Sequence, residues 1–300
     1  MTALRQAAAT CTDIACATMG RGQVVRAARF VLRRARLDVA NDLTSNGESS
    51  LQQWILREFP FGRRAHVIDV GANVGRWSAA MLATARRAGR LAAVDLHAFE
   101  PSAETFGRLS RQLRGQPVRL HKAALSDHVG WAELHVVAPG AGRNSLHRQA
   151  DPDPGGVTEI VATTTLDCHA EHTGADHVTL VKVDAEGHDL AVLRGGRNLI
   201  AGHRIWAAQF EYNHRWIDAR AYLRDAFELF APYGYRVGKL TPGGIEFYSA
   251  WDPELETFVE GNYVACLPGL AERLPAVAWW KRTTRPVSQH ADTSAPGARA

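Results

Sequence analysis

Short apolar runs alternate with longer segments of helical periodicity through the middle of the chain. Apolar runs of strand length lie at 66–70, 92–99, 118–123, 178–184 and 205–210. Segments whose apolar residues recur every three or four positions follow near 75–88, 102–114, 188–200 and 217–231. Strands that alternate with helices in this way form parallel sheets covered on both faces. The pattern therefore predicts an α/β fold with a doubly wound, mostly parallel sheet.

The pattern changes between the third and fourth of these strands. Residues 130–137 and 159–165 alternate apolar and polar positions, and the segment between them is rich in Pro, Gly and Asp. This is typical of two antiparallel strands joined by a long loop, so we predict a β insertion. Further short β segments at 235–237, 245–248 and 263–265 predict antiparallel strands at the carboxyl-terminal edge of the sheet.

The ends of the chain differ from the middle. Residues 1–20 are expected to be poorly ordered, 21–60 to form a helical segment, 61–282 the main domain, and 283–300 a disordered tail. A basic helix is predicted over 22–38, with Val24, Ala28, Val31 and Ala35 on one stripe. We expect this stripe to pack on the core; because the stripe is narrow, contact with a membrane surface is the alternative. A turn-rich connector over 41–48 and a short helix over 50–59 follow.

Composition narrows the class of protein. The chain has 300 residues, 46% of them hydrophobic and 22% charged, which is ordinary for a globular protein with one large domain. The formal net charge of +4 is too small to predict a nucleic-acid partner. No apolar run approaches the roughly 20 residues of a membrane span. Four scattered cysteines without zinc-type pairing favour a reducing, cytoplasmic location. A cytoplasmic location is compatible with peripheral contact to a membrane.

The most informative motif is a glycine turn after the first strand. Residues 67–75 read Val-Ile-Asp-Val-Gly-Ala-Asn-Val-Gly, and the second strand ends at Glu100. Glycines let the backbone approach a ligand, and an acid after the second strand can bind ribose hydroxyls. The turn lacks the Gly-x-Gly-x-x-Gly spacing of dinucleotide sites, and Asp69 before it suits a ligand ammonium. We therefore favour S-adenosylmethionine (SAM) as the ligand; tight packing of the turn, and a first-turn acid at Glu100, are the structural alternatives.

Two further residues follow the third strand. Ser126 and Asp127 lie where an adenine edge would be if ribose is bound at Glu100, and Asp127 can accept from an adenine amino group. A simple turn at the end of a strand is an equal interpretation.

The fourth strand ends in a dense group of ionisable residues: Lys182, Asp184, Glu186, His188 and Asp189. Because residues two apart share a strand face, Lys182 and Asp184 should lie together. Such a group can remove a proton from a hydroxyl, or hold a divalent metal through oxygen ligands, of which Asp184 is the best candidate. Alternatively, Lys182 and Asp184 only neutralise each other, and Asp189 belongs to the first turn of a helix.

Three residues are candidates for the substrate side. Glu211 and His214 end the fifth strand at the same edge, and Asn144 lies in the inserted loop. Each can form hydrogen bonds with sugar hydroxyls; a solvated loop is the competing interpretation.

Taken in order, "VIDVGANVGRWS", "FEPS", "ALSD", "TTLD" and "LVKVDAEGHDLAVLRG" resemble the FkbM family of SAM-dependent methyltransferases over about residues 66–212. The resemblance implies the seven-stranded class I methyltransferase (Rossmann-like) fold and methylation of hydroxyl oxygens of sugars, glycolipids or polyketides. It also implies roles for single residues: Gly71, Ala72, Asn73 and Gly75 around the methionine part of SAM, Asp69 near its amino group, Glu100 at the ribose, Ser126 and Asp127 at the adenine, and Asp184 and Glu186 in catalysis or metal binding. Ala185, His188, Asp95 and His97 depart from the family's usual residues.

The leading hypothesis is a SAM-dependent O-methyltransferase with a small-molecule or glycolipid hydroxyl acceptor. The base is expected among Asp184, Glu186 and His188, with Lys182 beside them, or a metal held at Asp184 lowers the pKa of the hydroxyl. A non-catalytic SAM- or nucleotide-binding module, recruited through the basic helix, is the alternative from another class. The charged group on the fourth strand favours the enzyme, and the missing middle glycine disfavours a third option, an NAD-dependent dehydrogenase.

Overall fold

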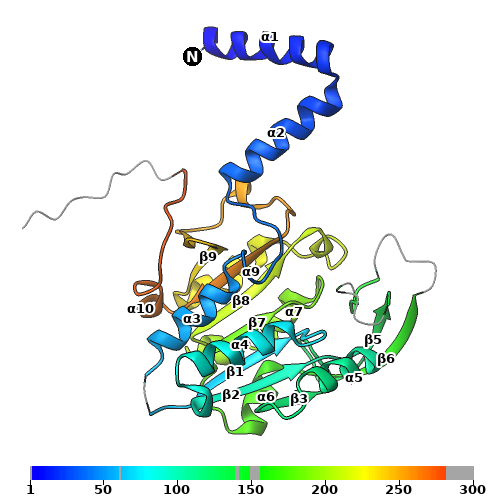
Figure 1. The fold of residues 1–300 in the computed structure, drawn as a ribbon, viewed down its shortest axis with the longest axis vertical. Coiled ribbons are helices and arrows are strands. Elements are labelled where there is room, and N and C mark those ends of the chain that lie inside the picture. Colours follow the sequence, from blue (N-terminus) through cyan, green and yellow to red (C-terminus); the bar gives the residue numbers. More distant parts are fainter. Residues whose placement is uncertain (1, 61, 139–141, 143, 149–155, 282–300) are drawn as a thin grey trace, which may run out of the picture.

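A large twisted sheet organises the computed structural model, which describes residues 2–60, 62–138, 142, 144–148 and 156–281 (Figure 1). Eight strands lie side by side in the order β10-β9-β11-β8-β7-β1-β2-β3. Their bounds are β1 Ala65–Val70, β2 Val94–Phe99, β3 Val118–His121, β7 Leu180–Val183, β8 Ala207–Tyr212, β9 Arg236–Thr241, β10 Gly244–Tyr248 and β11 Gly261–Cys266. The five predicted core strands are therefore confirmed, within a few residues at each end.

Most of the sheet is parallel, as predicted. Strands β3, β2, β1, β7 and β8 pair in parallel, whereas β11 pairs antiparallel with both β8 and β9, and β10 pairs antiparallel with β9. The sheet has eight strands rather than the seven expected, because β10 extends its edge. β1 lies between β2 and β7, so the order of strands reverses there. In such sheets a crevice opens beside the carboxyl ends of the strands at the point of reversal.

The β insertion forms a small second sheet, with the order β4-β6-β5. β5 Gly130–Val136 and β6 Val157–Thr164 pair antiparallel, as expected, and β4 Ala124–Leu125 joins β6 in parallel. The third core strand ends at His121 instead of residue 123, because the chain leaves the large sheet there to pair with β6.

Helices cover both faces of the large sheet. One face carries α3 Glu48–Glu58, α4 Arg76–Arg87 and α5 Ala103–Gln112, with the short α10 Pro268–Ala271. The other carries α6 Leu166–Thr173, α7 Asp189–Arg194, α8 Arg197–Ala201 and α9 Leu223–Phe230. Short 3-10 turns lie at Leu91–Ala93, His214–Trp216, Ala231–Tyr233 and Pro253–Leu255.

Three helix predictions need correction. The helix expected over 188–200 is divided at Gly195, where a Cβ would lie 2.0 Å from the Ser126 carbonyl oxygen, so the close approach of the two segments breaks the helix. The helix expected over 217–231 begins only at Leu223. Helix α6 was not predicted, although Thr165 caps it by accepting a hydrogen bond from the Cys168 N–H at 3.0 Å.

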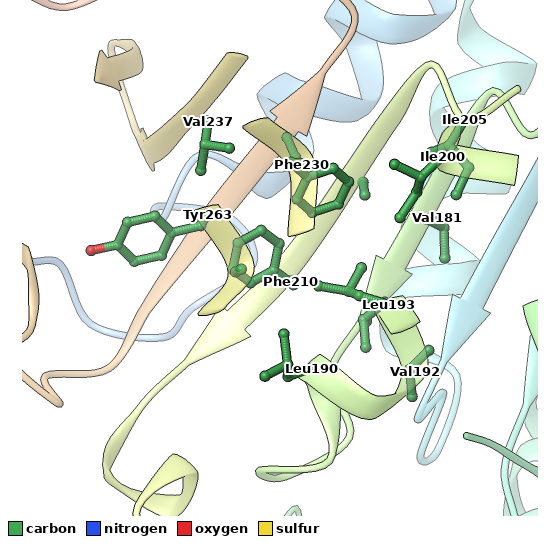
Figure 2. Close-up of a cluster of buried hydrophobic side chains, with 14 of the residues drawn as sticks. Val181, Leu190, Val192, Leu193, Ile200, Ile205, Phe210, Phe230, Val237 and Tyr263 are labelled. Atoms are coloured by element: carbon green, nitrogen blue, oxygen red, sulfur yellow. The ribbon is translucent and has the colours of Figure 1, made fainter. Parts of the chain in front are cut away.

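The largest apolar cluster fills the space between β7, β8 and the helices α6 to α9. Figure 2 shows its centre, where the Phe210 ring lies between the strands and Phe230 of α9, with Leu190 and Leu193 beside it. These four side chains are at most 2% exposed. The cluster holds β7 and β8 rigidly, so the residues at their carboxyl ends have fixed positions.

The amino-terminal segment differs most from the prediction. Residues expected to be poorly ordered form α1 Thr2–Met19, whose alanines have high helix propensity. The basic helix is present as α2 Arg21–Ala35, but none of its residues is buried, so the expected packing of its apolar stripe on the core is wrong. Both helices protrude from the α/β body (Figure 1). The predicted tail at 283–300 lies outside the described residues.

Candidate active site

A cavity of about 600 Å³ opens at the carboxyl ends of β1, β2 and β7, where the order of strands reverses. Its described lining comes from five segments: Asn41, Asp42, Leu43, Thr44 and Glu48; residues 70–74 with Arg76 and Trp77; Phe99, Glu100, Pro101 and Thr105; Ala123, Ala124, Leu125, Leu134, Gly142, Asn144 and Leu146; and Lys182, Asp184, Ala185, Glu186 and His188. Cavities of this size accommodate drug-sized ligands.

The glycine turn forms one side of this cavity. Gly71 has φ +69°, and a Cβ there would lie 1.9 Å from the Asp184 carbonyl oxygen. The turn is held further by hydrogen bonds from the Ala72 N–H to the Phe99 carbonyl oxygen and from the Asp184 N–H to the Val70 carbonyl oxygen. Gly71, Ala72 and Asn73 line the cavity, as their predicted role requires. We call residues 70–74 together with 99–101 the cofactor wall.

Gly75 serves packing instead. It does not line the cavity, and a Cβ there would lie 2.8 Å from a methyl carbon of Leu109 in α5. For this glycine the packing interpretation of the motif fits the structure, because the start of α4 lies close to α5.

Glu100 faces the cavity and also organises its wall. Its two carboxylate oxygens accept hydrogen bonds from the Asn73 N–H and the Ser102 N–H, both at 3.0 Å. Burial raises the pKa of Glu100 to about 7, despite these hydrogen bonds, which favour the charged form. The remaining lone pairs of the carboxylate are available to hydroxyl donors, so the position suits a ribose.

Asp69 does not reach the cavity, contrary to the expected contact with a ligand ammonium. It is fully buried and accepts a hydrogen bond from the Ser78 hydroxyl at 2.7 Å. Its second oxygen lies 3.5 Å from the Lys182 ammonium, because the two residues occupy paired positions on β1 and β7. Asp69 therefore holds Lys182 in position and does not contact a ligand in the cavity itself.

Lys182 joins the two sides of the site. Its ammonium lies 3.1 Å from Asp184 as well as 3.5 Å from Asp69. Burial disfavours its charged form, but Asp184, Asp69 and Glu48 outweigh burial and raise the pKa of the Lys182 ammonium. Lys182 is therefore charged, and it offsets two carboxylates.

Ser126 and Asp127 also lie away from the cavity lining, where Leu125 takes the place expected for them. Ser126 is fully buried, and its hydroxyl lies 2.9 Å from His188 Nε2. The other ring nitrogen of His188 lies 3.0 Å from His147 Nε2. Burial lowers the pKa of His188 to about 4, so the ring is neutral near pH 7 with both nitrogens engaged. His188 is thus poorly placed to act as a base.

The fourth-strand group brings its acids together as predicted. Oxygen atoms of Asp184, Glu186 and Glu211 all lie within 4.8 Å of one another, and we call these three residues the acid edge. Glu186 lies 2.7 Å from the guanidinium of Arg215, which was not among the predicted site residues. Burial and the nearby Asp184 raise the pKa of Glu186 to about 8, more than Arg215 lowers it.

Asp189 has a structural role. Its carboxylate accepts hydrogen bonds from the N–H groups of Ala185 at 3.1 Å and Gly187 at 3.0 Å. This shapes the turn that carries Glu186, whose φ is +53°. The interpretation of Asp189 as a first-turn residue of the next helix agrees with the bounds of α7.

The predicted substrate residues fall in different places. Asn144 lines the cavity, whereas Glu211 and His214 do not. Glu211 is 3% exposed and accepts hydrogen bonds from the side-chain amides of Asn41 and Asn213. Burial raises the pKa of Glu211 well above its ordinary value. Its place is behind the cavity lining, among the buried polar groups.

The connector over 41–48 was missed as part of the site. Asn41 donates to Glu211 at 2.9 Å, and Glu48 accepts from Asn46 at 2.7 Å and from Asn262 at 3.2 Å. Its run of Asn, Asp, Ser and Thr was the available signal, because these side chains bond locally and to neighbouring segments. Nothing in the run indicates which distant residues it meets.

Two groups of described residues have the composition of metal ligands: the acid edge, and His97, His121 and His169. In the histidine group the nearly parallel rings of His97 and His121 approach at 3.0 Å between nitrogens, and Arg119 contacts the other nitrogen of His97 at 2.9 Å. Both ring nitrogens of His97 are therefore engaged in hydrogen bonds. The positive charge of the Arg119 guanidinium beside them disfavours binding of a metal cation. At the acid edge, Lys182 and Arg215 already neutralise two carboxylates.

The model of the methyltransferase FkbM domain matches residues 69–237. Among curated proteins, no sequence matches this chain. Solved structures with a similar fold include the precorrin-6y C5,15-methyltransferase of Geobacter metallireducens (13% identity, 78% of this chain and 95% of that chain, TM-score 0.38). Others are the bifunctional kinase-methyltransferase WbdD (13%, 76% and 40%, TM-score 0.40) and Aeropyrum pernix fibrillarin in complex with SAM (10%, 72% and 74%, TM-score 0.37).

Proposed function

The chain belongs to the FkbM methyltransferase domain family, a family of SAM-dependent methyltransferases, and we propose that it transfers a methyl group from SAM to a hydroxyl oxygen. The proposed acceptor is a small molecule or glycolipid of the sugar or polyketide class. The observation that carries this proposal is the position of Asp184 and Glu186 in the same cavity as the cofactor wall. An acceptor oxygen bound between them and the cofactor has a proton acceptor beside it.

The cavity fits SAM on three observations. Its volume of about 600 Å³ suits a ligand of this size, and Glu100 offers a carboxylate for ribose hydroxyls. Two buried atoms of the lining, Asn73 Oδ1 and Trp77 Nε1, have no hydrogen-bond partner among the described residues. One is an acceptor and the other a donor, as the amino and carboxyl groups of the methionine part require.

We propose Gly71, Ala72, Asn73, Trp77 and Glu100 as the cofactor-binding residues. Asp69 acts indirectly, through Lys182 and Ser78. Because acids outnumber cations around the cavity, a ligand with a positively charged sulfur and an amino group is favoured there over a pyrophosphate.

Asp184 is the proposed base. When bound, SAM supplies a methyl group attached to a positively charged sulfur. In the transfer, the acceptor oxygen forms the new O–C bond as the S–C bond breaks, and Asp184 accepts the hydroxyl proton. Asp184 is 31% exposed toward the cavity, and the Lys182 ammonium at 3.1 Å stabilises its carboxylate.

Glu186 is proposed to orient the acceptor. The Arg215 guanidinium at 2.7 Å fixes the Glu186 side chain at the cavity, where it can accept a hydrogen bond from a hydroxyl of the acceptor. Asn144, on the opposite lining, is the proposed contact for a further hydroxyl. Lys182 and Arg215 neutralise two acids without a metal, so we propose transfer that does not depend on a divalent ion. Free cysteines are consistent with a cytoplasmic location.

Methyl transfer from labelled SAM to glycolipid and polyketide extracts tests this proposal, with and without a chelator. Asp184→Asn should lower transfer about 100-fold or more, with unchanged SAM affinity, because it removes the proton acceptor, while Lys182 keeps Asp69 as a partner and the Asp184 backbone keeps its contact with Gly71. Asp218→Asn, a partly exposed residue outside the cavity lining, is the matched control. Full transfer by Asp184→Asn would contradict the assignment of the base, and loss of transfer with chelator would contradict metal independence.

A further inference from the structure

Helix α2 presents an unpartnered amphipathic surface. Six of its apolar residues, Val24, Val25, Ala28, Val31, Leu32 and Ala35, recur at the spacing that places them on one helical face, whereas Phe30, which is 68% exposed, lies on another. Val25 is 47% exposed, Val31 65% and Leu32 55%. None of them is buried, and Figure 1 shows α2 extending away from the sheet. We call this face of α2 the exposed stripe.

A helix of this kind needs a partner. Isolated helices of about 15 residues are marginal in water, and most helical stability in proteins comes from packing an apolar face. The preceding helix α1 does not provide it, because Leu4, Ile14 and Met19 of α1 are themselves 59–82% exposed. Among the described residues, hydrogen bonds to the body are formed just after α2, where the Arg36 guanidinium donates to the Glu254 carbonyl oxygen and Lys239 donates to the Arg36 carbonyl oxygen.

The charge beside the exposed stripe is entirely positive. Five arginines lie in α2, at positions 21, 26, 29, 33 and 34, and the helix contains no acidic residue. In the part of the chain that the structure describes, none of the five forms an ion pair. The surface that complements this helix is therefore apolar in the middle and negatively charged around it.

We propose that α2 docks on the surface of an anionic lipid membrane. The exposed stripe enters the boundary between headgroups and acyl chains, while the arginines contact acidic headgroups. A second copy of the chain is a poor occupant, because two α2 helices packed by their stripes would bring ten arginines together without an acid between them. None of the described helices has the length and hydropathy needed to cross a bilayer, so the contact is peripheral.

The test is sedimentation of the full chain with vesicles of phosphatidylcholine alone or with about 30 mol% phosphatidylglycerol. We expect binding only to the anionic vesicles, and a decrease as salt screens the charges. Each arginine near an anionic surface contributes about fivefold, so Arg29→Gln/Arg33→Gln/Arg34→Gln should weaken partitioning about 100-fold. Val31→Gln/Leu32→Gln should weaken it without any change of charge.

Matched controls separate this surface from the rest of the molecule. Arg111→Gln/Arg114→Gln/Arg197→Gln removes three exposed arginines of the body, and Val129→Gln/Ile160→Gln removes two exposed apolar residues of the insertion. Both should bind vesicles like the wild type. Circular dichroism and thermal melting check that each variant is folded.

Three results would overturn the proposal. The first is absence of binding to anionic vesicles, and the second is equal binding by the wild type and both α2 variants. The third is a dimer that both α2 variants dissociate, which would assign the stripe to a second copy. Because the assay contains neither SAM nor acceptor, its outcome is independent of the proposed methyl transfer.

Discussion

The two sides of the cavity differ in the groups that form them: mainly backbone atoms on one side and ionisable side chains on the other. The cofactor wall relies on backbone: Gly71 packs against the Asp184 carbonyl oxygen, and two N–H groups hold the Glu100 carboxylate. The acid edge relies on carboxyl side chains, two from the segment after β7 and one from β8 behind the lining, which Lys182 and Arg215 partly neutralise. A cofactor common to a whole family can be recognised by a fixed backbone, whereas proton transfer needs groups whose charge can change. The comparison predicts that damage to each side has a different consequence.

The largest effect is expected where the two sides meet, at Lys182. Lys182→Met leaves Asp69 and Asp184 without their shared cation, and unpaired buried charges are costly. We expect a loss of about 4 kcal/mol in the free energy of unfolding, measured by urea denaturation. Lys122→Met, at an exposed lysine, should change it by less than about 0.5 kcal/mol. A stable Lys182→Met protein would show that the carboxylates do not need this cation.

A smaller loss of stability is expected from Gly71→Ala. The new Cβ meets the Asp184 carbonyl oxygen at 1.9 Å, and the backbone has positive φ, so the cofactor wall must move away from the acid edge. Together these should cost about 3 kcal/mol. Gly89→Ala has a similar φ of +65° with no atom within 4 Å, and should cost only about 1 kcal/mol in the same denaturation experiment. Equal losses would mean that the close approach is unimportant.

The smallest of the three effects concerns pH and Glu100. Its pKa rises from 4.5 in the unfolded chain to about 7 in the folded protein, so the folded state binds the proton more tightly. The contribution of Glu100 to the stability of the ligand-free protein should therefore fall as pH rises from about 5 to 8, whereas buried histidines with lowered pKa values, such as His97 and His188, contribute in the opposite direction. The difference in stability between the wild type and Glu100→Gln should therefore change by on the order of 2 kcal/mol between these two pH values, because the other titrating groups are common to both proteins. Denaturation curves at both pH values measure this change. If Glu100 were ionised throughout, the free energy of unfolding would depend on pH in the same way in the wild type and in Glu100→Gln.

The sheet, and the position of residues 71–73 and Glu100 at one cavity, could be predicted from the sequence because both depend on local patterns. Alternating apolar segments mark β1, β2, β7 and β8, and the glycine turn is contiguous in the chain. Contacts between segments that are distant in the sequence could not be predicted from such local patterns. Nothing local reveals that Asp69 points beneath the cavity toward Ser78 and Lys182, or that Ser126 bonds His188.

The amino-terminal helices show the same limit in another form. Helical periodicity and arginines predicted α2, but a stripe on a helix indicates only that some apolar partner exists. The core was the expected partner, but the stripe is exposed in the structure. The connector after α2 likewise contains Asn41 and Glu48, whose polar character was visible but whose place in the site depends on the fold.

Titration of the chain with SAM in a calorimeter tests the central claim most directly, since every further step depends on that cofactor. We predict one SAM bound per chain. Glu100→Gln should bind at least about tenfold more weakly, because it loses a charged acceptor for the ribose hydroxyls. Glu104→Gln, at a side chain that is 60% exposed in α5, should bind like the wild type. Absence of SAM binding by the wild type, or equal affinity in Glu100→Gln, would contradict the account.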